Sequence, residues 1–128
     1  MRETLLGIQG ESSMLAEGHR RAAEGIEKAI VKLQPDFDSG VARVVIESAW
    51  GAAFHWIAFG CETKHQQHKN DHSRLGRFLR DRGEKSTADS WESLDLIRQG
   101  GWYGSEPDLV AVQRGLEFLA QIRLWATQ

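Results

Sequence analysis

The sequence has little of what would mark a secreted or strongly charged protein. Cys61 is the only cysteine, so an internal disulfide is excluded, and no signal-peptide pattern opens the chain. Sixteen basic against eighteen acidic residues give a net charge of −2, which provides no global attraction to nucleic acid or to an anionic membrane. At 128 residues the chain fits one domain, and we expect a cytoplasmic protein with a core from about 11 to 126.

Runs of alternating apolar and polar residues, which mark half-buried strands, are missing too. Five stretches instead carry apolar residues at the spacing of helices. The first covers about 11–33, with an apolar face that includes Ala22, Ile26 and Ala29. The second, about 40–64, has two apolar stripes, one that includes Val44, Val45, Ala52 and Trp56 and one that includes Ile46, Ala53 and Ile57. It is therefore expected at the centre of a bundle rather than in a membrane, where Glu47 and His55 would be costly. Its small residues, among them Ala49, Ala52 and Ala53, would allow a partner helix to approach.

Three further helices complete the prediction. A short third helix carries Leu75, Phe78 and Leu79, with Asp71 or Ser73 as its cap, and "RGEKSTADS" after it is predicted to be a loop. The fourth carries Trp91, Leu94 and Ile97 and is predicted to end at Gly100–Gly101. The fifth is predicted to start at Ser105, with Pro107 in its first turn and a core face of Leu109, Val112, Leu116 and Leu119. The fold class is all-α.

Two short stretches resemble one family. "ESAWGAAFHWIAF" contains Ser48 to His55 in a pattern similar to the second helix of HEPN domains (higher eukaryotes and prokaryotes nucleotide-binding). "IRQGGWYG" places Arg98, Tyr103 and Gly104 in a pattern similar to the Leu-Arg and Asp-Tyr-Gly positions of many HEPN domains. The resemblance implies an up-and-down four-helix bundle with an additional short helix, paired as a homodimer.

The nuclease branch of that family carries an arginine, four to six residues, and then a histidine. Arginine there stabilises a phosphate and histidine moves a proton. No arginine in this chain is followed by a histidine at that spacing. The resemblance therefore implies a non-catalytic binding module without a cofactor, for a nucleotide, an RNA or a nucleotidyltransferase-type partner in a toxin–antitoxin-like setting. A degenerate ribonuclease is the alternative.

Four residues are candidates for ligand binding: Arg98, Trp102, Tyr103 and His55. The planar fork of an arginine suits phosphate, and an aromatic ring can stack on a base. In the competing interpretation, Arg98 caps the end of the fourth helix, Trp102 and Tyr103 fill the bundle, and His55 is a core histidine bonded to a neighbouring helix.

A cluster of metal-ligand residues follows the second helix. Glu62, His65, His68 and His72 are spaced by three, three and four, so a continuous helix would place them on one side. Imidazole and carboxylate groups in such an arrangement can bind zinc, nickel or iron, which gives a metal-binding bundle as a third function. The alternative is a solvated segment between helices.

Positive charge is concentrated locally. Residues 62–85 hold seven basic and four acidic groups, a local charge of +3, and Arg74, Arg77 and Arg80 recur at every third position. Such a face could meet RNA phosphates or an acidic partner, or it could be the solvated side of a helix.

Overall fold

The most apolar stretch of the sequence forms the central helix. In the computed structural model, the backbone is described for residues 2–33, 39–69, 72–103 and 108–128, and the side chains for 16–33, 40–69, 72–100 and 108–128. Helix α2 (Ser39–His65) packs against α1 (Arg2–Leu33), α4 (Lys85–Tyr103) and α5 (Leu109–Thr127). The short helix α3 (Leu75–Asp81) packs against α4.

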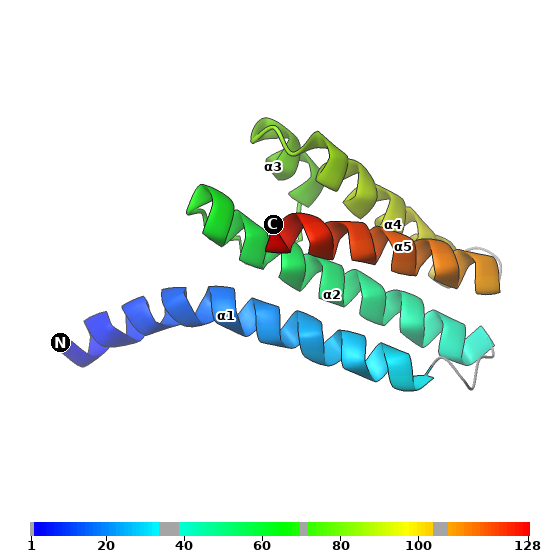
Figure 1. Ribbon diagram of the computed structural model, residues 1–128, viewed down its shortest axis with the longest axis horizontal. Helices are drawn as coiled ribbons and strands as arrows, with labels where there is room; N and C mark the ends of the chain where they lie inside the picture. Colours follow the sequence, from blue (N-terminus) through cyan, green and yellow to red (C-terminus); the bar gives the residue numbers. More distant parts are fainter. Residues whose placement is uncertain (1, 34–38, 70–71, 104–107) are drawn as a thin grey trace.

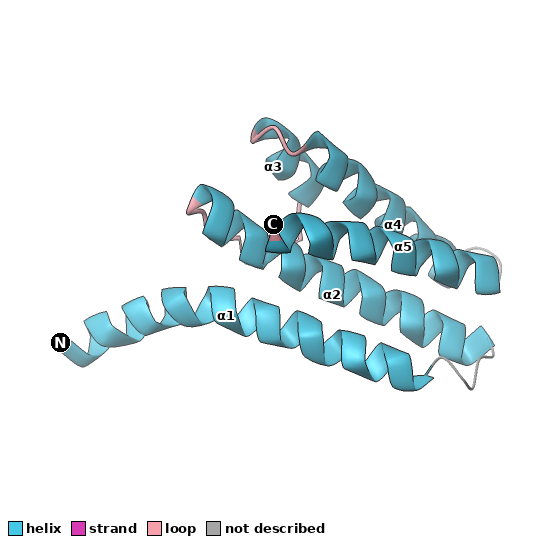
Figure 2. Cartoon of the chain, viewed as in Figure 1, coloured by secondary structure: helices cyan, strands magenta, loops and turns pink. Residues whose placement is uncertain are grey.

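The four long helices run alternately in opposite directions (Figure 1). Figure 2 shows helices and loops but no strand among the described residues. The predicted all-α bundle with one additional short helix is therefore confirmed.

Helix α2 owes its central place to apolar residues on several sides. Six of the residues predicted to face the core are almost fully buried: Val45, Ile46, Ala52, Ala53, Trp56 and Ile57. Val44 was expected in the same stripe but is 51% exposed, so that assignment is wrong. The contact with three other long helices explains why no single polar stripe runs along α2.

Length and composition alone would also allow α2 to cross a membrane. Residues Gly40–His65 pass that test, as core helices of soluble proteins do, and 56% of the most apolar window is buried inside the protein. Its apolar character is thus accounted for by packing against neighbouring helices.

Helix α1 begins at Arg2, earlier than predicted, and its buried face is rotated by one position. Ala23 and Ile30 are buried, whereas Ala29, which was expected to face the core, is exposed. Among the described elements, the backbone of α1 comes close only to α2. The other side of α1 is therefore uncovered by helices (Figure 1).

The region around α3 differs from the prediction at both ends. Arg74, rather than Ser73, precedes the first residue of α3, and it makes no side-chain capping bond; Asp71 lies outside the described residues. Helix α4 begins at Lys85, so most of the predicted loop is helical. Burial of Thr87 and Ala88 explains the difference, because packing against the bundle outweighs the weak helix propensity of this stretch.

The two glycines of "IRQGGWYG" do not end helix α4. The helix continues through Gly100 to Tyr103, which corrects the predicted end. Asp108 caps α5 by accepting a hydrogen bond from the Ala111 amide at 2.9 Å, whereas Ser105 and Pro107 lie outside the described residues. The α5 core includes Val112 and Leu119 as predicted and Leu116 in part, but Leu109 is 51% exposed.

Candidate functional site

The candidate arginine lies on α4 and faces α2. The Arg98 Nε atom donates to Glu47 Oε2 at 2.5 Å, and Nη1 lies 3.6 Å from Asp95 Oδ1. The guanidinium carbon lies 4.1 Å from the centroid of the Trp50 ring. Arg98 is half-buried, and two carboxylates and one aromatic ring surround its charge. It does not cap the helix end.

Trp50, on α2, contacts both Arg98 and the carboxylate of Asp95. Its indole Nε1 donates to Asp95 Oδ1 at 2.8 Å, so the same carboxylate contacts both Trp50 and Arg98. The Trp50 ring also packs 5.3 Å from Trp91 and 4.8 Å from His72, measured between centroids. The arginine is thus fixed by a network that lies within the protein.

His55 pairs with a histidine of the first helix. The Nδ1 atoms of His55 and His19 are 2.8 Å apart, so one imidazole donates its proton and the other accepts it. Burial, with smaller contributions from His55 and His68, lowers the pKa of His19 to about 4. Burial also lowers the pKa of His55. Both rings are therefore neutral at pH 7.

The Nε2 atom of His19 is buried without a hydrogen-bond partner among the described residues. Phe54 packs between the histidines and the tryptophan region, with ring centroids 5.9 Å from His19 and 6.4 Å from His72. A series of ring contacts, His55–Phe54–His72–Trp50, leads from His55 to Arg98. No hydrogen bond joins these two ligand-binding candidates in the described structure.

Trp102 and Tyr103 belong to the last turn of α4. Their side chains lie outside the described residues, so the predicted grouping of Tyr103 with Arg98 stays a prediction.

The four residues of the predicted metal cluster do not converge. Helix α2 ends at His65 and the chain turns at Gln66, whose φ is 53°, so the continuous helix that would align them is interrupted. His68 Nδ1 lies 3.4 Å from Glu62 Oε1, while His72 packs on Trp50. Within the described ranges, no three histidine, cysteine, aspartate or glutamate side chains are placed to hold a metal ion.

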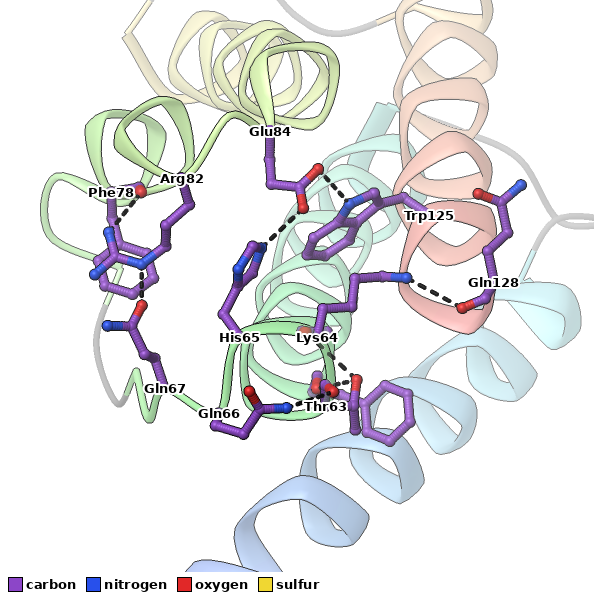
Figure 3. Close-up of polar contacts among 12 residues, drawn as sticks. Thr63, Lys64, His65, Gln66, Gln67, Phe78, Arg82, Glu84, Trp125 and Gln128 are labelled. Carbon is purple, nitrogen blue, oxygen red and sulfur yellow. Dashed lines mark hydrogen bonds and ion pairs between the residues drawn. The ribbon is translucent and has the colours of Figure 1, made fainter.

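His65 instead joins three helical segments at one end of the bundle. Its Nε2 donates to Glu84 Oε2 at 2.8 Å, and Glu84 Oε1 accepts from Trp125 Nε1 at 2.9 Å (Figure 3). The Lys64 ammonium donates to the Gln128 carbonyl at 3.1 Å beside this pair. These bonds connect the end of α2 with the start of α4 and the end of α5, which is a structural role.

Sequence reasoning missed several residues of these networks. Glu47 and Trp50, three residues apart on α2, and Asp95 and Arg98, three apart on α4, are the pairs that meet. The spacing of three residues places each pair on one helix face, and this spacing is the only sequence feature that could have indicated these residues. Which face meets which depends on tertiary packing.

Comparisons with known proteins gave no match to a family model, a curated protein or a solved structure. The resemblance to HEPN domains therefore rests on the two short stretches of sequence.

Proposed function

We propose that the protein is a non-catalytic, cytoplasmic binding module of HEPN type. It acts as a homodimer that recognises a nucleotide, an RNA or a nucleotidyltransferase-type protein in a toxin–antitoxin-like setting. The observation that carries the non-catalytic part is the pairing of Arg98 with Glu47 and Asp95.

A catalytic arginine must offer its positive charge to the reacting phosphate. The charge of Arg98 is already compensated by two carboxylates, and Trp50 covers one face of its guanidinium. An incoming phosphate would have to displace Glu47 and would then lie beside the like charge of its carboxylate, which is unfavourable. This geometry supports a structural role for Arg98.

The histidines support the same conclusion. Cleavage of RNA by general acid–base catalysis needs one group that gives a proton and one that takes it near neutral pH. His19 and His55 are both neutral there because burial lowers the pKa of each, and their Nδ1 atoms are engaged with one another. The pair is suited to joining α1 to α2.

Purified protein incubated with mixed RNA oligonucleotides is expected to show no cleavage above background. Arg98→Ala should behave identically in this assay and should lower the free energy of unfolding by about 1 kcal/mol, because a half-buried ion pair is lost. Arg114→Ala, at an exposed position on α5, is the matched control and should change neither quantity. Robust cleavage by the wild type that disappears in Arg98→Ala would refute the non-catalytic function.

The homodimer needs a different surface from the one the sequence indicated. The small residues of α2 were expected to allow a partner helix to approach, but Ala49, Ala52 and Ala53 are fully buried within one chain. They bring neighbouring helices of the same molecule close. A dimer would instead use a face such as the uncovered side of α1.

Sedimentation equilibrium at micromolar concentrations is expected to give twice the chain mass of 14.4 kDa. A specific pair would bury more than about 1,000 Å² in total. A single species at the mass of one chain would contradict the dimer and would leave the non-catalytic function untouched.

A further inference from the structure

A cavity of about 480 Å³, open to solvent, lies beside α3, and Arg98 is not among its lining residues. Its lining consists of the following residues: Lys69, Ser73, Arg74, Arg77, Phe78 and Asp81. Three of these side chains are cationic and one is a carboxylate, so the lining carries a net charge of about +2 in a chain whose net charge is −2. The cavity is therefore a local positive site on an otherwise slightly acidic protein.

The arginines around α3 differ in whether their side chains form ion pairs within the protein. Arg80 pairs with Asp89 and Glu92 at 2.6 Å each, so the third arginine of the periodic series is neutralised. Arg74 and Arg77 are exposed and line the cavity. Neither guanidinium forms a hydrogen bond or an ion pair with a residue in the described part of the chain. Two guanidinium groups thus remain to meet a ligand.

The aromatic ring of Phe78 forms part of the cavity lining, and Arg82 packs against it. Arg82 stacks on the Phe78 ring with its guanidinium carbon 3.5 Å from the centroid, and it donates to the Phe78 carbonyl at 2.9 Å (Figure 3). The Lys69 ammonium lies 5.2 Å from the same centroid. These contacts hold the ring and add positive charge at the wall.

The backbone at Arg74 provides an independent observation. Its φ of 55° and ψ of 30° place it in the left-handed region, where a residue other than glycine costs about 1–2 kcal/mol. Glycine would adopt this conformation without that cost. The arginine side chain forms no capping bond that would offset the strain. The fold therefore gives no reason for an arginine at position 74, which points to binding of a ligand by the Arg74 guanidinium.

We propose that this cavity binds the phosphate of a nucleotide or of single-stranded RNA. Arg74 and Arg77 present planar forks that match phosphate oxygens, and Lys69 adds a point charge. Phe78 offers an apolar wall for a base, and the Asp81 carboxylate can accept a hydrogen bond from a ribose hydroxyl. An acidic peptide would bring no base to pack against Phe78. The proposal rests on the recognition of a nucleotide or RNA proposed above and places the ligand beside α3 rather than beside Arg98.

The test measures binding of four probes by calorimetry or fluorescence anisotropy. Three carry phosphate, namely inorganic phosphate, adenosine monophosphate and a labelled single-stranded RNA oligonucleotide, and the fourth is a poly-glutamate peptide. Arg74→Gly is the most informative variant because it removes the charge and the backbone strain together. We expect it to be at least as stable as the wild type and to bind about tenfold more weakly or worse, as loss of a charge-assisted bond predicts. Arg77→Gln should weaken binding similarly.

Control variants separate this site from others. Arg114→Gln on α5 and Arg98→Ala on α4 should leave binding unchanged, because neither residue lines the cavity. Tight binding of the monophosphate would identify a nucleotide site, and tight binding of RNA alone would identify a strand-binding site. Both support the proposal.

Three results would overturn it. These are failure of the wild type to bind any of the phosphate-bearing probes, which would also refute the proposed recognition of a nucleotide or RNA; affinities of Arg74→Gly and Arg77→Gln equal to that of the wild type, which would refute this site alone; and stronger binding of a poly-glutamate peptide than of RNA. Cleavage of RNA that depends on Arg98 would instead refute the non-catalytic function and leave this site intact.

Discussion

Replacing Gly60 with alanine is expected to lower the free energy of unfolding by about 1–3 kcal/mol, the usual cost of overpacking a core. Gly60 is buried in α2 and faces the indole of Trp125 on α5. A Cβ atom at position 60 would lie 2.6 Å from Trp125 Cη2 and closer still to Cζ3. The ring cannot move aside easily, because its Nε1 is bonded to Glu84.

The matched control is Gly25→Ala in α1. Nothing lies within 4 Å of the Cβ position there, and the residue is exposed in a helix. Alanine should therefore raise stability by about 0.5–1 kcal/mol through helix propensity. Chemical denaturation of both variants checks the contrast. Equal effects at positions 60 and 25 would show that α2 and α5 do not approach closely at Trp125.

Acidification is expected to destabilise the protein through His19. The pKa of this imidazole is about 4 in the folded protein, against 6.5 for an unperturbed histidine. The unfolded chain therefore binds the proton more tightly than the folded chain does between these two values. Stability is full above pH 6.5 and falls as the pH is lowered towards 4.

The expected loss from His19 is about 1–2 kcal/mol, less than the full pKa difference implies, because water screens a half-buried ring. His55 contributes in the same direction, since burial lowers its pKa too. Denaturation of the wild type and of His19→Gln at pH 7 and pH 4.5 isolates the effect from titrating carboxylates. A wild-type pH dependence no steeper than that of the variant would contradict this origin.

The extent of the helices was predictable where apolar periodicity is strong. The long apolar run of α2 and the Val112–Leu119 face of α5 lead directly to their observed places. The start of α4 was not predictable in this way, because Ser86, Thr87 and Ser90 favour turns in isolation. Burial of Thr87 and Ser90, and the bond from Ser90 to Gln121 at 2.9 Å, become visible only once α5 is in place.

Glycines alone were a poor guide to the end of α4. Gly100 costs about 1 kcal/mol relative to alanine in a helix, which other contacts of the helix can offset. A helix end needs a chain reversal or a cap as well as a tolerant residue. The backbone continues as a helix through Gly100 to Tyr103.

Individual residues of the candidate site could be predicted from the sequence, but the residues with which they form contacts could not. Arg98 and His55 were identified from the sequence, yet their partners are Glu47 and His19, which lie 51 and 36 positions away along the chain. Local spacing carries no information about such pairs, because they depend on which helix faces meet. The interpretation of Arg98 changes once its carboxylate partners are known.

The central position of α2 determines the order in which its faces are buried by other helices during synthesis. α1 precedes α2 and can pack against it as soon as both have been made, whereas α5 follows more than 40 residues after the end of α2. Domains begin to fold from the N-terminal side as they emerge. The apolar face of α2 around Gly60 therefore stays exposed until Trp125, near the end of α5, has been synthesised. During that time it can contact other hydrophobic segments in the cell.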